Sequence, residues 1–270
     1  ALIFSSDLGS FPSDLGFFFR ALFVILLCQA LLLLAGALYQ LFCRRDPHAV
    51  LYNFGTFLTN VVFIGLPFVH TLYGRNSQSM LYMAVFIILN NIFTFSYGIW
   101  LLKRGTVEHA TLGSMLRNPP LLAAIGLIVL YILHWHLPPL ALSSLKMLGQ
   151  LAPPLSMMLI GASLVGTRVD ELLSDRALLV FTVLKMLFIP AAIVITLRLF
   201  TDDVNLLGVS MICIATPTGV MLPMLTTLHR PMLSLMSNRM VTITTAVAIL
   251  TIPLVNLTVS MPLPFGAVCQ

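Results

Sequence analysis

The chain alternates between long apolar stretches and short polar connections. A helix that crosses a membrane needs about 20 mostly apolar residues, and eight stretches come close to or exceed that length. They run over 17–42, 51–73, 79–102, 119–136, 143–166, 177–199, 204–228 and 238–260. Residues 1–8 have the composition of the end of a further span. The pattern predicts an all-α polytopic membrane protein, located in the inner or plasma membrane.

The composition agrees with this interpretation. Hydrophobic residues make up 59% of the chain and charged residues 9%, whereas a soluble domain carries roughly a quarter charged residues. The four cysteines (Cys28, Cys43, Cys213 and Cys269) lack the spacing of metal ligands. The chain also lacks a His-Glu-x-x-His motif, a Gly-x-Ser-x-Gly motif and a glycine-lysine phosphate loop. We therefore expect neither an enzyme nor a cofactor.

The basic residues predict the orientation of the spans. Nine of them fall in connections on one side of the predicted bundle and four on the other. Because short cytoplasmic loops carry the excess of Lys and Arg, the first side is expected to be cytoplasmic and the C-terminus to face outward. The net charge of +5 is thus explained by orientation, without a nucleic-acid partner.

Two halves of the chain align without gaps at a shift of 156 residues. The informative matches are Asp14 on Asp170, Arg20 on Arg176 and Pro67 on Pro223. The shift predicts a first repeat over 1–102, a cytoplasmic connecting loop over 103–118 and a second repeat over 119–261. Residues 119–156 have no partner at the front, so we expect roughly 37 further residues before Ala1 and ten spans, of which about 8.5 are present. Five crossings per repeat would invert the second repeat relative to the first.

The fourth helix of each predicted repeat contains helix breakers. The first has Gly65 and Pro67, and the second has Pro217, Gly219 and Pro223. Proline removes a backbone donor and clashes with the preceding turn, so both helices are expected to break at mid-membrane. Paired breaks at corresponding positions indicate a substrate site, and the helix N-termini that they expose favour an anion. The alternative is that both prolines only kink the helices for packing.

Polar residues inside the other spans add to the candidate site. Asn90 and Asn91 lie mid-span and could instead bond across helices. Lys185, which aligns with Gln29, could balance an anion or extend its stem to the membrane surface. The full set of candidate substrate-binding residues is Asn60, Gly65, Pro67, Asn90, Asn91, Gln150, Lys185, Thr216, Pro217, Thr218 and Pro223.

Several segments, in order along the chain, resemble the auxin efflux carrier family in its shorter bacterial form. They are Asn60 through Gly65-Leu66-Pro67 to Tyr73-Gly74, Asn118-Pro119-Pro120, Pro154 through Gly161-Ala162-Ser163-Leu164, Thr216-Pro217 through Leu228-His229, and Thr251-Ile252-Pro253. The resemblance implies crossed, broken helices in an inverted-repeat fold similar to sodium/bile-acid symporters and NhaA-like transporters. It also implies elevator-type export or exchange of an organic anion, such as a dicarboxylate or an auxin-like acid, and a possible homodimer.

Other functions stay open at this point. A sodium-coupled symporter of the bile-acid type shares the ten-span plan and would require sodium for uptake. A membrane receptor or sensor would bind its ligand without flux. A membrane enzyme is the least favoured, because no catalytic set of residues is present.

Overall fold

The structure, a computed structural model, describes residues 15–73, 77–104, 138–164 and 174–260, together with Leu122, Gly126 and Leu172. In these residues every regular element is a helix, and the one β pairing is an isolated bridge between Thr59 and Thr218. Four helical segments are long and apolar enough to cross a membrane, namely Phe19–Phe42, Gln78–Lys103, Arg176–Leu197 and Pro231–Ile252. The prediction of an all-α, multi-pass membrane protein is confirmed. The predicted span 119–136 lies outside the described residues except for Leu122 and Gly126.

The helices follow the predicted spans in order. The first half contains α2 (Leu15–Phe42), α3 (Ala49–Phe57), the π-helical turn η1 (Val61–Gly65), α4 (Leu66–Tyr73), α5 (Ser77–Phe93), the π-helical turn η2 (Thr94–Gly98) and α6 (Ile99–Lys103). The second contains α9 (Pro139–Leu164), α11 (Arg176–Val183), the π-helical turn η3 (Leu184–Phe188), α12 (Ile189–Leu197), α13 (Val204–Ala215), α14 (Met221–His229), the short 3₁₀ turn η4 (Pro231–Leu233) and α15 (Ser234–Ser260).

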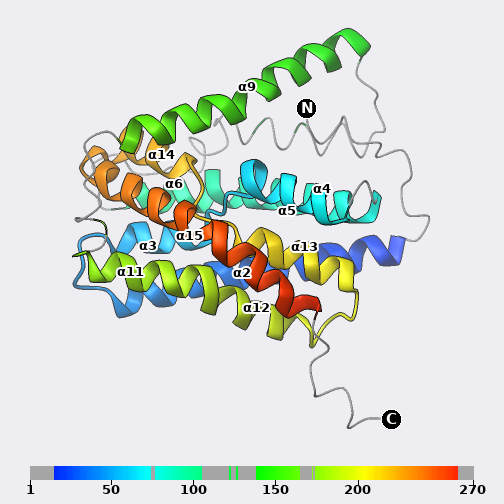
Figure 1. Cartoon of the computed structure of the whole chain (residues 1–270), viewed down its shortest axis with the longest axis horizontal. Helices are drawn as coiled ribbons and strands as arrows, with labels where there is room; N and C mark the ends of the chain where they lie inside the picture. Colours follow the sequence, from blue (N-terminus) through cyan, green and yellow to red (C-terminus); the bar gives the residue numbers. More distant parts are fainter. Residues whose placement is uncertain are drawn as a thin grey trace.

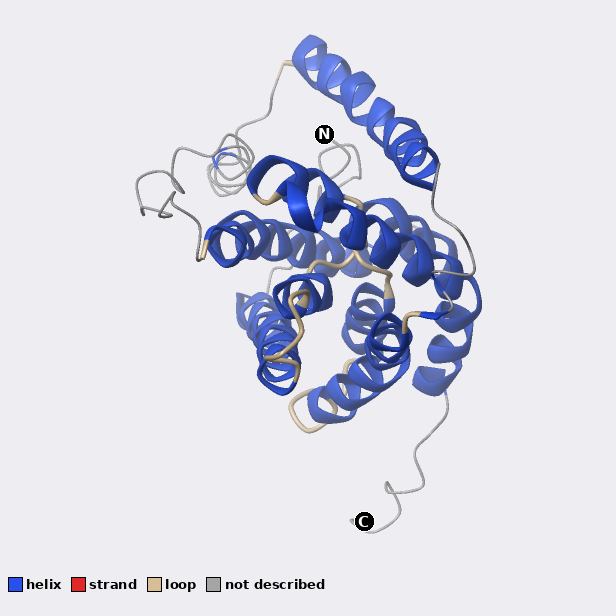
Figure 2. Ribbon diagram, turned by 90° about the vertical axis from the view of Figure 1, so that its left-hand side faces the viewer, coloured by secondary structure: helices blue, strands red, loops and turns tan. Residues whose placement is uncertain are grey.

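Most of these helices pack side by side in one bundle (Figure 1). In the view turned by 90°, several of them are seen nearly end-on, and α9 lies apart along the edge (Figure 2). The main contact of α9 with the bundle is with α15. Large apolar side chains such as Phe42, Leu199 and Ile249 remain on the outer surface. An apolar exterior over a packed interior suits lipid as the surrounding solvent.

Close approaches between helices depend on glycine. A Cβ on Gly36 of α2 would lie 2.7 Å from Asn53 Oδ1 and 2.8 Å from Asn53 O on α3. A Cβ on Gly98 would lie 2.5 Å from Cε2 of the fully buried Phe54. Both distances are shorter than a Cβ atom permits. The absence of a side chain at these glycines therefore allows α2 and the η2 turn to pack closely against α3.

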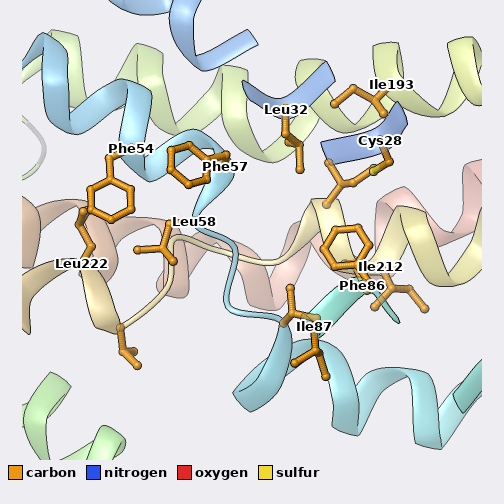
Figure 3. Close-up of a cluster of buried hydrophobic side chains, with 14 of the residues drawn as sticks. Cys28, Leu32, Phe54, Phe57, Leu58, Phe86, Ile87, Ile193, Ile212 and Leu222 are labelled. Carbon is orange, nitrogen blue, oxygen red and sulfur yellow. The ribbon is translucent and has the colours of Figure 1, made fainter. Parts of the chain in front are cut away.

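The apolar core surrounds the middle of the bundle. Figure 3 shows Phe54 and Phe57 of α3, Cys28 and Leu32 of α2, Phe86 and Ile87 of α5, Ile193 of α12, Ile212 of α13 and Leu222 of α14 around two non-helical stretches of chain. Leu58 lies where these two stretches meet. The packed core therefore surrounds two helix interruptions, the one between α3 and η1 and the one between α13 and α14.

Candidate functional site

Two interrupted helices cross inside the bundle. Helix α3 ends at Phe57 and η1 begins at Val61, while α13 ends at Ala215 and α14 begins at Met221. The backbone N–H of Asn60 donates to Pro217 O at 2.8 Å, and that of Gly219 donates to Leu58 O at 2.8 Å. These two bonds form the antiparallel bridge of Thr59 with Thr218. We call the segments Leu58–Asn60 and Thr216–Val220 together the crossing.

The second break follows from local sequence. A proline disfavours helical geometry in the residue before it, and Thr216, which precedes Pro217, is extended with φ −65° and ψ 149°. The Thr216 hydroxyl donates to Cys213 O at 2.8 Å and so satisfies a carbonyl at the end of α13. Pro223 lies in the first turn of α14, where a helix does not use the backbone N–H. The prediction of a break between Thr216 and Pro223 is confirmed.

The predicted break at Gly65 and Pro67 is wrong. The chain is helical from Val61 to Tyr73, and the break lies before it, at Leu58–Asn60. The η1 turn absorbs the proline, because the Leu66 N–H bonds to Val61 O, five residues back. A π-helical turn of this kind is a local adjustment that lets a membrane helix retain proline.

Gly65 still contributes to the crossing, by its size. A Cβ at Gly65 would lie 3.2 Å from Met83 Cε and 3.3 Å from Thr216 Cγ2. Gly55 is similar, since its Cβ would lie 2.6 Å from Met240 Cε and 3.5 Å from Thr218 Cγ2. These glycines allow the second broken helix and α15 to approach the first.

Side chains from the second half of the chain satisfy the carbonyl end of α3. Gly55 O accepts from the Thr218 hydroxyl at 3.3 Å, and Thr56 O accepts from Lys185 Nζ at 2.8 Å. Thr218 is held in turn from α15, because its N–H donates to the Thr244 hydroxyl at 3.2 Å. The negative end of the α3 dipole therefore faces a positive charge, which is the favourable arrangement.

Lys185 is buried at this position. Only 1% of the residue is exposed, so the alternative that it extends to the membrane surface is wrong. Within the described part of the chain, no carboxylate lies within 4.0 Å of the amino group of Lys185, which bonds to Thr56 O. Lys185, beside the crossing, thus has no neighbouring carboxylate partner among these residues.

Several buried polar atoms near the crossing lack a hydrogen-bond partner. Asn60 Nδ2 and Thr59 Oγ1 belong to residues that are 3% exposed. Asn90, on α5, is 5% exposed and its Oδ1 is also without a partner, while the neighbouring Asn91 is half-buried. Helix α5 packs against α13. Buried polar atoms are rarely left unpaired in proteins, so unpaired atoms in this region are consistent with a ligand-binding role.

The remaining candidate lies elsewhere, and some residues at the crossing were not predicted. Gln150 is on α9, at the edge of the bundle, and its side chain is outside the described part. Leu58 and Thr59 of the crossing could not be predicted, because neither residue type is a helix breaker. Gln29 of α2 is fully buried, with both amide atoms unpartnered.

A multi-pass helical bundle with two interrupted, crossing helices in its interior is typical of membrane transporters. Over residues 1–256 the chain matches the family model described as "Membrane transport protein", which is the auxin efflux carrier family. The chain belongs to this family, as its motifs predict, and the family is one of membrane transporters and not of enzymes. A search of curated proteins finds no match.

Proposed function

We propose that the protein is a secondary active transporter that moves a small organic anion, such as a dicarboxylate or an auxin-like acid, through a site at the crossing. The observation that carries the proposal is the buried Lys185 ammonium at the end of α3, bonded to Thr56 O at 2.8 Å. A buried charge is expensive unless it is compensated. An anion bound at the crossing would supply that compensation during transport.

The backbone around the crossing favours an anion for a second reason. Helix α14 and the helical segment Val61–Tyr73 both begin at the crossing, and the first N–H groups of a helix have no partner within the helix. Such N-termini carry about +0.5 of an elementary charge each. The C-termini of α3 and α13 also end at the crossing and are negative, but Lys185 compensates the end of α3. In a low-dielectric interior a carboxylate is attracted to the two N-termini.

Within this proposal the candidate residues have different roles. Asn60, with its unpaired Nδ2, and the Thr216–Thr218 segment would contact the carboxylate directly. Gly65, Pro67 and Pro223 would shape the helices on either side of it. Asn90 and Asn91 of α5 would line the path beside α13, Lys185 would supply the charge, and Gln150 of α9 would lie farther along.

Element bounds support two inverted repeats over 1–102 and 119–261. A shift of 156 residues moves α2 (Leu15–Phe42) onto 171–198, which contains α11, η3 and α12 over Arg176–Leu197. The same shift moves Ser77–Lys103 onto 233–259, which is matched by α15 at Ser234–Ser260. The two breaks correspond to within a few residues. Because backbone bonds join the two broken helices, we propose that they move together as one body in an elevator-type cycle.

A flux experiment tests the site. Purified protein in proteoliposomes would be assayed with a panel of radiolabelled dicarboxylates and aromatic acetic acids. Asn60→Ala is expected to lower flux by tenfold or more, because each lost hydrogen bond to a charged group weakens binding by roughly 1.5–3 kcal/mol. Asn205→Ala is the matched control, since Asn205 lies in the first turn of α13, away from the crossing.

The outcomes separate the proposal from its alternatives. Unchanged flux in Asn60→Ala would remove the site assignment, and no flux of any organic anion would overturn the proposed substrate class. Saturable binding without flux would favour a receptor or sensor. Uptake that stops when sodium is replaced by choline would favour the sodium-coupled symporter.

A further inference from the structure

The carbonyl end of α3 is closed by groups from far along the chain. The last four carbonyls of a helix have no partner within it. At this end Gly55 O accepts from the Thr218 hydroxyl, Thr56 O from Lys185 Nζ and Leu58 O from the Gly219 N–H. Of these three donors only the amino group of Lys185 can carry a charge.

Free carbonyls at the end of an interrupted membrane helix are suitable ligands for a monovalent metal cation. In secondary transporters such helix C-termini and unwound carbonyls coordinate sodium. An ammonium group has the same charge as a sodium ion and donates hydrogen bonds to the same oxygens. At 1% exposure and 2.8 Å from Thr56 O, the ammonium of Lys185 already occupies the position next to the carbonyls.

We propose that Lys185 is a built-in cation at the carbonyl end of α3, which replaces a bound sodium ion, and that removing its charge converts this end into a site for a sodium or lithium ion. Lys185 is thus a positioning residue for the crossing, which it stabilises through Thr56. One consequence of this inference rests on the proposed transport function: transport by the natural protein should not depend on sodium bound at this site.

The first half of the chain indicates which substitution to test. The 156-residue shift places Gln29 on Lys185, and both residues are fully or almost fully buried, at 0% and 1% exposure. The fold therefore accommodates a glutamine at the position that corresponds to Lys185. Lys185→Gln removes the charge and adds an amide oxygen that could itself bind a cation. Lys185→Met removes the charge without adding an oxygen ligand.

Thermal unfolding of the purified full-length protein tests the inference without a substrate. Midpoints would be measured in sodium, lithium, potassium or choline chloride at one ionic strength. The control variant is Lys103→Met, which makes the same chemical change as Lys185→Met but at the end of α6. The natural protein and Lys103→Met are each expected to have the same midpoint in sodium as in choline. Lys185→Gln is expected to unfold roughly 2–4 °C higher in sodium or lithium than in choline.

Three outcomes overturn the inference. The first is a natural protein that is itself stabilised by sodium relative to choline. The second is that Lys185→Gln and Lys185→Met both fold and that each has the same unfolding midpoint in all four salts. The third is a failure of both variants to fold in any salt, because a metal cation then does not replace the ammonium.

The flux assay keeps this test separate from the proposed function. Sodium-dependent flux of an organic anion by the natural protein would support anion transport in its sodium-coupled alternative form and would overturn the built-in cation. If sodium stabilises Lys185→Gln against unfolding but the natural protein transports no organic anion, the built-in cation is supported and the proposed function is overturned.

Discussion

Thr59 and Thr218 lie directly opposite each other as an antiparallel pair. The two hydrogen bonds beside them join Asn60 N to Pro217 O and Gly219 N to Leu58 O, so the threonines form the non-hydrogen-bonded kind of pair. In such a pair the Cα atoms are about 4.5 Å apart and the side chains are close. The pair connects two helices that belong to different halves of the chain.

The first prediction is that a disulfide forms across the crossing. Thr59→Cys with Thr218→Cys, in a background whose four native cysteines are replaced by serine, is expected to oxidise readily because the pair geometry lies within the range of natural disulfides. Loss of both free thiols, measured by intact mass after alkylation, is the readout. Thr59→Cys with Thr226→Cys serves as the control pair, since Thr226 lies along α14 and bonds to Ser237 at 2.8 Å. Equal oxidation of both pairs would show that the threonines do not face each other.

The second prediction concerns the space beside α3. Gly98→Ala is expected to lower the free energy of unfolding by about 1–3 kcal/mol, because its Cβ would lie 2.5 Å from Phe54 Cε2. Phe54→Leu is expected to restore part of the loss when the two changes are combined. Gly161→Ala is the control, with nothing within 4 Å of its Cβ. Equal midpoints for Gly98→Ala and Gly161→Ala would contradict the close packing.

The third prediction concerns the start of α13. Asp203 accepts from the N–H groups of Asn205 and Leu206 at 2.9 and 3.1 Å, and its other oxygen accepts from the Tyr82 hydroxyl at 2.7 Å. Asp203→Ala removes both the helix cap, about 0.5–2 kcal/mol, and the acceptor for Tyr82. It should therefore destabilise the protein more than Tyr82→Phe does.

A double-mutant cycle checks this arrangement. Because the Tyr82 bond is lost in both single variants, their combined cost should fall short of the sum. Asp175→Ala is a suitable comparison, since Asp175 caps α11 by accepting from the Leu178 N–H at 3.1 Å. Strict additivity of Tyr82→Phe and Asp203→Ala would argue against direct contact.

The fourth prediction uses two buried amides with different surroundings. Gln29→Met is expected to raise the free energy of unfolding by about 1 kcal/mol or more, because neither atom of the amide has a partner and its burial is unfavourable. Asn53→Leu should do the opposite, since Asn53 Nδ2 donates to Gln40 Oε1 at 2.6 Å and to the Tyr97 hydroxyl at 3.1 Å. Denaturation midpoints in detergent measure both. A destabilised Gln29→Met would indicate that the amide binds something in the folded protein.

The sequence was informative where a local rule decides the structure. Apolar length predicted the spans, and Pro217 predicted the second break because proline dictates the conformation of the residue before it. The first break could not be found in this way. Leu58, Thr59 and Asn60 contain no strong breaker, and their non-helical shape depends on hydrogen bonds to Pro217 and Gly219.

The same limit applies to single side chains. From the sequence, Lys185 could equally have reached the membrane surface, because a lysine stem is long and flexible. Its burial depends on the free Thr56 carbonyl, and that carbonyl is free because α3 ends there. At Gly65 and Pro67 the sequence predicted a break that the structure does not have, because a π-helical turn accommodates both residues within a continuous helix.

The joint at the crossing consists of main-chain amides and carbonyls, which every residue except proline carries in full. Its strength therefore depends little on which side chains extend from Thr59, Asn60 and Thr218. Under the proposed function, point substitutions here would change the cargo preference while the architecture around the crossing stays intact. For protein engineering, it is a natural place to build a library of altered selectivity, with the hydrogen-bonded joint as the constant part.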